Sequence, residues 1–200
     1  MDGKKISGIV LTTDAHQIFY DHYLMGHKKI IVIAHGFFNS KKSVLIEEFI
    51  TFLGADFDVI VFDFRGHGES DGLFSWTVKE TLDLKAVLKY TGRKYKQIGL
   101  IGFSLGAAVS IIVLSESNAV NSFVSVSAPV EFKKIDYNFW NLDLEQDIYY
   151  NLTKGKKGKG VRPGPFWLKK KKPIKVVNKL TIPVLYIHGE DDWVIRPYHS

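Results

Sequence analysis

QIGLIGFSLGAAVSIIVL, from Gln97 to Leu114, is the stretch that decides the fold of this chain. Its two apolar halves flank Gly102-Phe103-Ser104-Leu105-Gly106, which spells G-x-S-x-G. A strand that turns abruptly into a helix strains its central residue and crowds the neighbouring turns, and glycine on both sides relieves the crowding. We therefore expect Ser104 at the carboxyl end of a strand as a nucleophile, with the N–H of Leu105 and the positive end of the next helix aimed at an oxyanion. A buried serine in an ordinary strand–helix turn is the alternative, because so short a pattern recurs by chance.

Three other segments share one design, a short apolar run that ends in a loop rich in glycine or carboxylates. They are KKIIVIAHGFFNS (Lys28–Ser40), DVIVFDFRGHGESDG (Asp58–Gly72) and TIPVLYIHGEDDWVIRP (Thr181–Pro197). In this order and spacing, together with the pentapeptide, they resemble the α/β-hydrolase superfamily. The resemblance runs from about Ile30 to the end of the chain. It implies an α/β fold, a mostly parallel, doubly wound sheet with an inserted lid.

The apolar periodicity agrees with this fold. Five short β-branched runs are typical of strands buried on both faces of a parallel sheet: Ile30–Ala34, Val59–Phe62, Ile98–Ile101, Phe123–Val126 and Val184–Ile187. Helices are expected over Val44–Leu53, from a T-x-x-E capping box at Thr77–Glu80 to just before Gly92, and over Leu105–Leu114. The alternation of strands and helices implies right-handed crossovers, and an antiparallel pair, Ser7–Thr12 with Gln17–Tyr23, leads into the sheet.

The composition excludes several classes of protein. At 200 residues, with 46% hydrophobic and 24% charged residues, the chain suits one soluble globular domain. No apolar run approaches the ~20 residues of a membrane span, and the start of the chain is too weakly apolar for a secretory signal, so we predict a cytoplasmic protein. The absence of cysteine excludes disulfides, thiolate metal sites and a cysteine nucleophile. There is no H-E-x-x-H metal spacing and no G-x-G-x-x-G nicotinamide turn, so neither a metal nor a cofactor is expected.

Positive charge concentrates in residues 129–180. This segment has thirteen Lys and Arg against five Asp and Glu, a net +8, which leaves −2 for the rest of the chain. We divide the chain into a first part of the hydrolase core (1–128), this basic lid or cap insert (129–180), and a second part of the core with the seventh strand and the acid loop (181–200). A solvated lid over the site is one interpretation of the insert. Contact of its lysines and aromatics with an anionic lipid surface or an anionic substrate is another, and a nucleic-acid partner is disfavoured.

The resemblance also implies roles for individual residues. The oxyanion hole combines the N–H of Leu105 with that of Phe37, and the substrate pocket is lined by His35, Gly36, Phe38 and Phe103. For His35 itself the main interpretation is structural, a side chain that ties the turn through hydrogen bonds, and contact with substrate is the alternative. His67, in the R-G-H-G-E-S segment, is expected to support the site rather than act as a base. The acid of the triad follows the seventh strand in an H-G-x-x-D-x-x-V loop, which selects Asp192. Its neighbours Glu190 and Asp191 are competitors for that role.

The triad histidine has no counterpart at the expected place. In α/β-hydrolases it follows an eighth strand, whereas this sequence stops at Ser200, eight residues after Asp192. His199 is interpreted as part of the helix that precedes that strand. We therefore expect a chain truncated at its carboxyl end, lacking the last strand and helix and nearly inactive alone. The predicted function is a serine hydrolase that cleaves an ester, thioester or related acyl bond of a small-molecule substrate through an acyl-enzyme on Ser104. The alternative is a non-catalytic protein of this fold that binds acidic lipid or another anionic partner.

Overall fold

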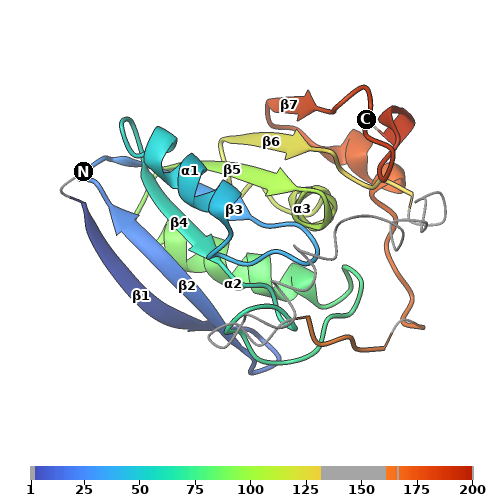
Figure 1. The fold of residues 1–200 in the computed structure, drawn as a ribbon, viewed down its shortest axis with the longest axis horizontal. Coiled ribbons are helices and arrows are strands. Elements are labelled where there is room, and N and C mark those ends of the chain that lie inside the picture. The colour runs from blue at the N-terminus through green and yellow to red at the C-terminus, as the bar shows by residue number, and fades with distance from the viewer. Residues whose placement is uncertain (1–2, 132–160, 166, 200) are drawn as a thin grey trace.

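The computed structural model describes residues 3–131, 161–165 and 167–199. Within this part of the chain, seven strands form one sheet in the order β1-β2-β4-β3-β5-β6-β7 (Figure 1). The strands are β1 (Lys4–Leu11), β2 (Gln17–Leu24), β3 (Lys29–Ala34), β4 (Asp58–Phe62), β5 (Gln97–Phe103), β6 (Ser122–Val126) and β7 (Val184–Ile187). The helices are α1 (Val44–Leu53), α2 (Glu80–Gly92) and α3 (Leu105–Leu114), with 3-10 turns η3 (Pro173–Lys175), η4 (Val177–Lys179) and η5 (Pro197–His199).

The pairing of the strands confirms the predicted sheet. Strands β4, β3, β5, β6 and β7 run parallel to one another, and β1 and β2 form an antiparallel pair that joins β4 through β2. Parallel strands need crossover connections, and the helices supply them. Because the carboxyl ends of parallel strands lie at one edge of the sheet, the loops after β3, β5 and β7 gather there.

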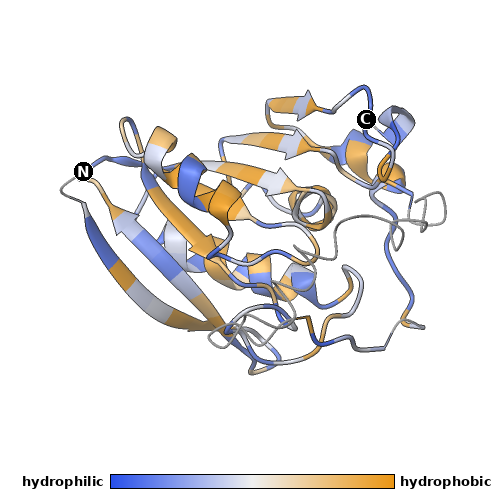
Figure 2. Ribbon diagram, in the orientation of Figure 1, coloured by the Kyte–Doolittle hydropathy of each residue, from blue (hydrophilic) through white to orange (hydrophobic). Residues whose placement is uncertain are grey.

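Two apolar layers hold the helices on the sheet. One face of β3 and β5 packs with α2 and α3, and typical buried side chains there are Val32, Leu100, Leu84 and Ile111. The other face packs beneath α1. Figure 2 shows apolar residues along β4, whose five residues are all buried, and alternating colours along β1, of which one face is exposed. The central strands therefore carry the core, as their continuous apolar runs predicted.

The start of α2 differs from the prediction. The helix begins at Glu80 rather than after a cap at Thr77, and it includes Gly92 as its last residue. Trp76 and Thr77 both have positive φ, 57° and 77°, which turns the chain away and delays the helix. Among the described residues the Thr77 hydroxyl has no hydrogen-bond partner. Ser75, and not Thr77, makes the side-chain hydrogen bond at the start of this helix: its hydroxyl accepts the N–H of Lys79 at 2.7 Å.

The sheet ends at β7, which pairs with β6 and has no second neighbour among the described strands. Three of its apolar side chains are exposed: Leu185 by 57%, Tyr186 by 44% and Ile187 by 46%. A strand edge with exposed apolar side chains is a site where another chain can pair.

In the described part of the chain, no helix is both long enough and apolar enough to cross a bilayer.

Candidate active site

Ser104 is the single residue between β5 and α3, and its backbone is strained. It has φ 47° and ψ −112°, a combination that non-glycine residues avoid. Hydrogen bonds hold this conformation from both sides. The Ser104 N–H donates to the carbonyl of Val126 at 2.8 Å, and its own carbonyl accepts the N–H of Ala108 at 3.0 Å. The serine is thus fixed at the edge of the sheet where the strands end.

The two glycines of the pentapeptide are required by close approach. A β-carbon on Gly102 would lie 2.7 Å from the α-carbon of Ala107, and one on Gly106 would lie 2.2 Å from the carbonyl oxygen of Ala34. Both distances are far below van der Waals contact. The first turn of α3 therefore packs directly on the ends of β3 and β5, as the crowding argument predicted.

The segment that follows β3, residues 35–43, lies beside Ser104. We call it the β3 loop. A β-carbon built on Gly36 would be 3.4 Å from the β-carbon of Ser104. The ring of Phe37 packs against those of Phe38 and Trp76, with centroid distances of 4.0 and 5.5 Å. Phe37 and Leu105 thus follow, by one residue each, the two positions that meet at this contact. Trp76 is a member of the cluster that sequence reasoning missed.

His35 is a structural residue of the β3 loop. Its Nδ1 donates to the carbonyl of Gly36 at 2.7 Å and its Nε2 accepts the N–H of Phe64 at 3.0 Å, which fixes the neutral tautomer. Burial lowers the pKa of His35, in agreement with a neutral ring. The residue is 1% exposed and supports the loop through these bonds, as its structural interpretation expected; a contact of His35 with substrate stays a prediction.

Phe103 and His67 are two further residues that the sequence assigned to the site or its support. Phe103 packs on Phe49 of α1, with ring centroids 5.2 Å apart, so its ring contacts the α1 side of the sheet and not the cluster around Phe37. His67 is buried beside His35, and burial, with a smaller contribution from the neighbouring His35 ring, lowers its pKa to about 3. A ring that is so hard to protonate is a poor general base, which agrees with the supporting role predicted for His67.

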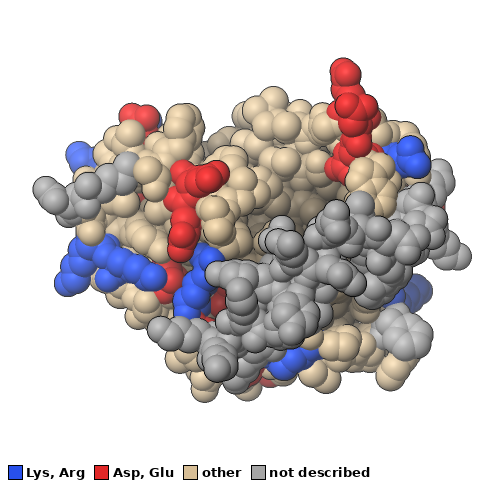
Figure 3. Space-filling view, viewed as in Figure 1, with Lys and Arg blue, Asp and Glu red and all other residues tan. Residues whose placement is uncertain are grey.

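Asp192 lies in the loop after β7, at the same edge of the sheet as Ser104 and two strands away. Its Oδ1 accepts the N–H groups of Val194 and Ile195 at 3.1 and 2.8 Å, and its Oδ2 is 3.6 Å from Nε2 of His188. The carboxylate is half-buried and oriented by its own turn. Its competitors Glu190 and Asp191 are exposed, and Figure 3 shows acidic side chains standing out beyond β7 at the upper right.

Comparison with known proteins identifies the family. A profile described as alpha/beta hydrolase fold matches residues 29–157. The chain belongs to this family. This α/β-hydrolase is similar to the uncharacterized protein YqkD of Bacillus subtilis, with 26% identity over 181 residues that cover 81% of this chain and 54% of the relative. It is also similar to ethanol acetyltransferase 1 of Cyberlindnera jadinii, with 33% identity over 109 residues, 52% of this chain and 32% of that protein. The chain spans about half and about a third of the lengths of these curated relatives.

Solved structures agree with the family. The esterase Pf2001 of Pyrococcus furiosus superposes with a TM-score of 0.78 at 26% identity, over 98% of this chain and 73% of the esterase. An alpha-beta serine hydrolase homologue from Coxiella burnetii superposes with a TM-score of 0.68 at 19% identity, over 96% of this chain and 77% of that one, and shows the fold alone. The α/β-hydrolase fold expected from the four ordered motifs is confirmed.

All seven histidines of this α/β-hydrolase lie in the described part of the chain, and no hydrogen bond there joins any of them to Ser104. Three lie on or near the antiparallel strands; of these, His22 bonds to the hydroxyl of Tyr95 at 3.0 Å. His188 directly follows β7 and donates to the carbonyl of Ile195. His199 is buried in η5, and its backbone N–H donates to Arg196 at 3.0 Å.

A buried ion pair that the sequence did not reveal ties the β3 loop to the segment after β4. Lys41 is almost fully buried, and its Nζ lies 3.0 Å from Oδ2 of Asp63 and also bonds to Glu69. Asp63 Oδ1 accepts the Lys41 N–H at 2.7 Å, and Oδ2 accepts the Glu69 N–H at 2.9 Å. Burial opposes the charge of Lys41, but the two carboxylates outweigh it and raise its pKa. The pair fixes the loop that carries Phe37.

Part of the basic insert is attached to the same region. Arg162 donates its N–H to Gly66 at 2.7 Å and accepts that of Phe74 at 2.8 Å, and its guanidinium bonds to the carbonyl of Ser70. The insert thus meets the loop that carries Trp76. Residues 132–160 and 166 of the insert lie outside the described residues, and the lid assigned to the insert stays a prediction.

Proposed function

We propose that this chain belongs to a serine hydrolase that cleaves a carboxylic ester, a thioester or a related acyl bond of a small molecule, with Ser104 as the nucleophile. The observation that carries the proposal is the strained conformation of Ser104, φ 47° at the junction of β5 and α3. Strained residues of this kind cluster at active sites. The likeness to an esterase at 26% identity over 98% of this chain supports the same reaction class.

The chemistry proceeds in two steps. The Ser104 oxygen attacks the acyl carbon while an imidazole takes its proton; the oxyanion is stabilised by the N–H groups of Leu105 and Phe37. The bond to the alcohol or thiol leaving group then breaks, and the imidazole returns the proton to that group. Water repeats the sequence on the acyl-enzyme, which releases the acid and free Ser104. Asp192 orients the imidazole.

The imidazole is expected from a version of the protein that continues past Ser200, because the family places this histidine after an eighth strand. A continuation of about 35–60 residues, a length inferred from the family, is expected to raise esterase activity by about 10³-fold, since removal of a triad member leaves mainly oxyanion-hole and binding effects. Full activity from the 200-residue chain that His199→Ala abolishes would contradict this assignment and make His199 the base.

The direct test is labelling with a fluorophosphonate probe in the longer version. We expect the label on Ser104, lost in Ser104→Ala. Ser127 is a matched control, because it also has a positive φ, 48°, and directly follows the neighbouring strand β6. Ser127→Ala should keep the label. A label that survives Ser104→Ala would overturn the proposal.

A non-catalytic binding protein is the second candidate. It is favoured by the absence, in the described part of the chain, of a hydrogen bond between Ser104 and any histidine. A longer version that neither reacts with the probe nor turns over 4-nitrophenyl acetate, and that nevertheless binds an anionic partner, would support this candidate instead.

We also propose that residues 129–180 act as a lid that controls access of the substrate, as inserts at this place in the fold vary freely.

A further inference from the structure

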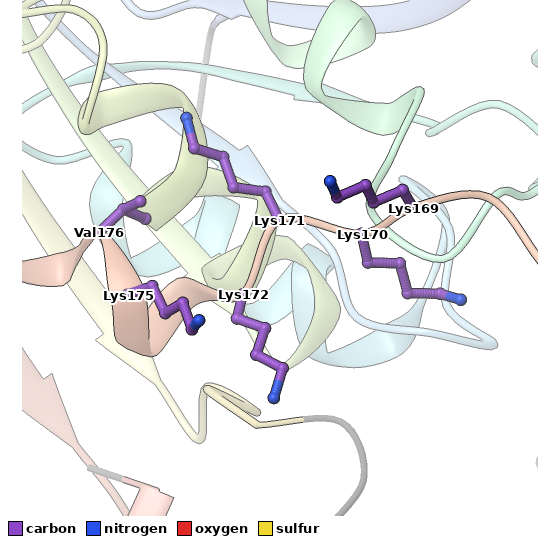
Figure 4. A pocket seen from close by; sticks show the side chains of 6 residues that line it. All are labelled: Lys169, Lys170, Lys171, Lys172, Lys175 and Val176. Atoms are coloured by element: carbon purple, nitrogen blue, oxygen red, sulfur yellow. The ribbon is translucent and has the colours of Figure 1, made fainter.

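Lysines gather on the side of the molecule where η3 packs on α3, and the proposed hydrolysis does not use them. Five of them and one valine line an open groove of about 500 Å³ (Figure 4). These residues are Lys169, Lys170, Lys171, Lys172, Lys175 and Val176. We call the first five the lysine row.

The lysine row presents alternate side chains outward. Lys169 and Lys171 are exposed, whereas Lys170 and Lys172 are half-buried. In Figure 4 the first pair points to one side of the chain and the second pair to the other. Two large apolar side chains near these lysines in sequence are exposed, Trp167 by 75% and Ile174 by 50%.

The lysine row is attached to the core. Pro173 and Val176 are buried next to it, and the N–H of Ile174 donates to the carbonyl of Val130 at 3.3 Å. The row therefore has a fixed position on the surface. This differs from a lysine-rich tail, whose charges are solvated on all sides.

Two carboxylates of the described residues pair with lysines at this place. Lys171 bonds to Glu116 at 2.6 Å, but Lys85 bonds to the same carboxylate at 2.8 Å. These two lysines lower the pKa of Glu116 to about 2. Lys172 bonds to Glu131 at 3.2 Å. Glu116 thus pairs with both Lys85 and Lys171, and Glu131 pairs with Lys172.

We propose that the lysine row is a docking surface for an anionic phospholipid bilayer, with Trp167 and Ile174 entering the headgroup region. Lysines near such a surface are attracted by its negative potential, and tryptophan favours the interface between water and lipid. An aliphatic and an indole side chain beside the charges suit a bilayer better than a nucleic acid. Nucleic-acid sites favour arginine, whose planar guanidinium matches phosphate and stacks on bases, and the row contains none.

The test is sedimentation of the 200-residue chain with vesicles. Vesicles of phosphatidylcholine are compared with vesicles that also contain phosphatidylserine, at low and at high salt. We expect binding to the anionic vesicles alone, and its weakening by salt. The variant with all of Lys169, Lys170, Lys171 and Lys172 changed to Gln should bind at least about tenfold more weakly.

A matched variant separates location from net charge. It changes Lys28, Lys29, Lys94 and Lys96 to Gln, four exposed lysines elsewhere on the chain. Its binding should stay within about twofold of the unchanged chain, and Trp167→Ala should reduce the binding that remains at high salt. Equal losses in the two lysine variants, or tighter binding of a single-stranded RNA homopolymer than of anionic vesicles, would overturn the proposal. Circular dichroism melts confirm that the variants fold. Vesicle binding needs no substrate, so its outcome is independent of labelling at Ser104.

Discussion

The carbonyl oxygen of Ala34 occupies the space that a β-carbon on Gly106 would need, since the two atoms would be 2.2 Å apart. This contact sets how closely the first turn of α3 approaches the end of β3. It therefore also sets the distance between Ser104 and the β3 loop. Neither element can keep its place if a side chain is added between them.

Gly106→Ala is expected to destabilise the chain by about 3 kcal/mol or more, because backbone rather than a flexible side chain must move. Gly92→Ala is the control. A β-carbon there meets no atom within 4 Å, and the residue lies in α2, so this change should raise the unfolding free energy by about 0.5–1 kcal/mol. Urea unfolding of both variants is the measurement. An unfolding free energy of Gly106→Ala equal to that of the unchanged chain, or above it, would show that α3 can move away from β3 without cost.

Ser104→Gly should make the chain more stable while it removes the nucleophile. Glycine adopts φ 47° without the steric cost that serine has, and we expect a net gain of about 1 kcal/mol after the larger entropy of the unfolded glycine is counted. Ser104→Ala keeps a β-carbon in the same strained position and should show no comparable gain. Thermal melts compare the two, and equal melting temperatures would mean that the backbone relaxes without difficulty.

The motif around Ser104 was predictable because its chemistry depends on neighbours in sequence. A serine between two glycines, with a β-branched run before it and a helix-forming run after it, specifies a strand, a turn and a helix locally. The parallel sheet was predictable for the same reason, since strands such as β4 are apolar along their whole length. The order of the strands was not predicted, because these local patterns do not say which strands pair.

The supporting residues were not predictable because their partners are distant in sequence. Lys41 meets Asp63, 22 positions away, and nothing near Lys41 marks it as a buried lysine. The capping box at Thr77 was wrong because positive φ values at Trp76 and Thr77 redirect the chain, and no glycine signals them. A structural role for His35 was expected from its position after the strand, but its partner Phe64, 29 positions away, was not predictable.

Lys41→Met is expected to cost about 3–5 kcal/mol of unfolding free energy, because it leaves the buried carboxylate of Asp63 without its counter-charge. The neighbouring Lys42 gives a close control. It bonds to the same Glu69 at 2.7 Å, but its side chain is 43% exposed, so Lys42→Met should cost no more than about 1 kcal/mol. Urea unfolding at neutral pH measures both, and comparable costs would show that the Lys41 pair is balanced by its desolvation.

Stability should fall as pH rises through the titration of Glu80. This carboxylate accepts the N–H of Ser75 at 2.7 Å, and burial, opposed by that bond and assisted by Asp83, raises its pKa from 4.5 to about 7. A carboxyl group with a raised pKa binds its proton more tightly in the folded state. Its contribution is thus complete below pH 4.5 and is lost as pH rises to about 7, by up to about 3 kcal/mol.

Glu80→Gln isolates this contribution, since glutamine stays neutral at every pH. His35 and His67 act in the opposite sense, because burial lowers their pKa values and their contribution is lost as pH falls below 6.5. Both are present in the variant, so they cancel in the difference between the two proteins. We expect the unfolding free energy of the unchanged chain, relative to Glu80→Gln, to decrease between pH 5 and about 8. A difference that is constant across this range would contradict the raised pKa.

The open edge at β7 has a practical consequence for all these measurements. Leu185 and Ile187 project from one side of the strand and Tyr186 from the other, and among the described strands the backbone of β7 pairs with β6 alone. Two copies of the chain can extend each other's sheet through this edge, which makes self-association compete with simple unfolding. The apparent midpoint of denaturation should then depend on protein concentration. Replacement of Leu185 by lysine, a charge that natural sheet edges use against pairing, should make the midpoint independent of concentration.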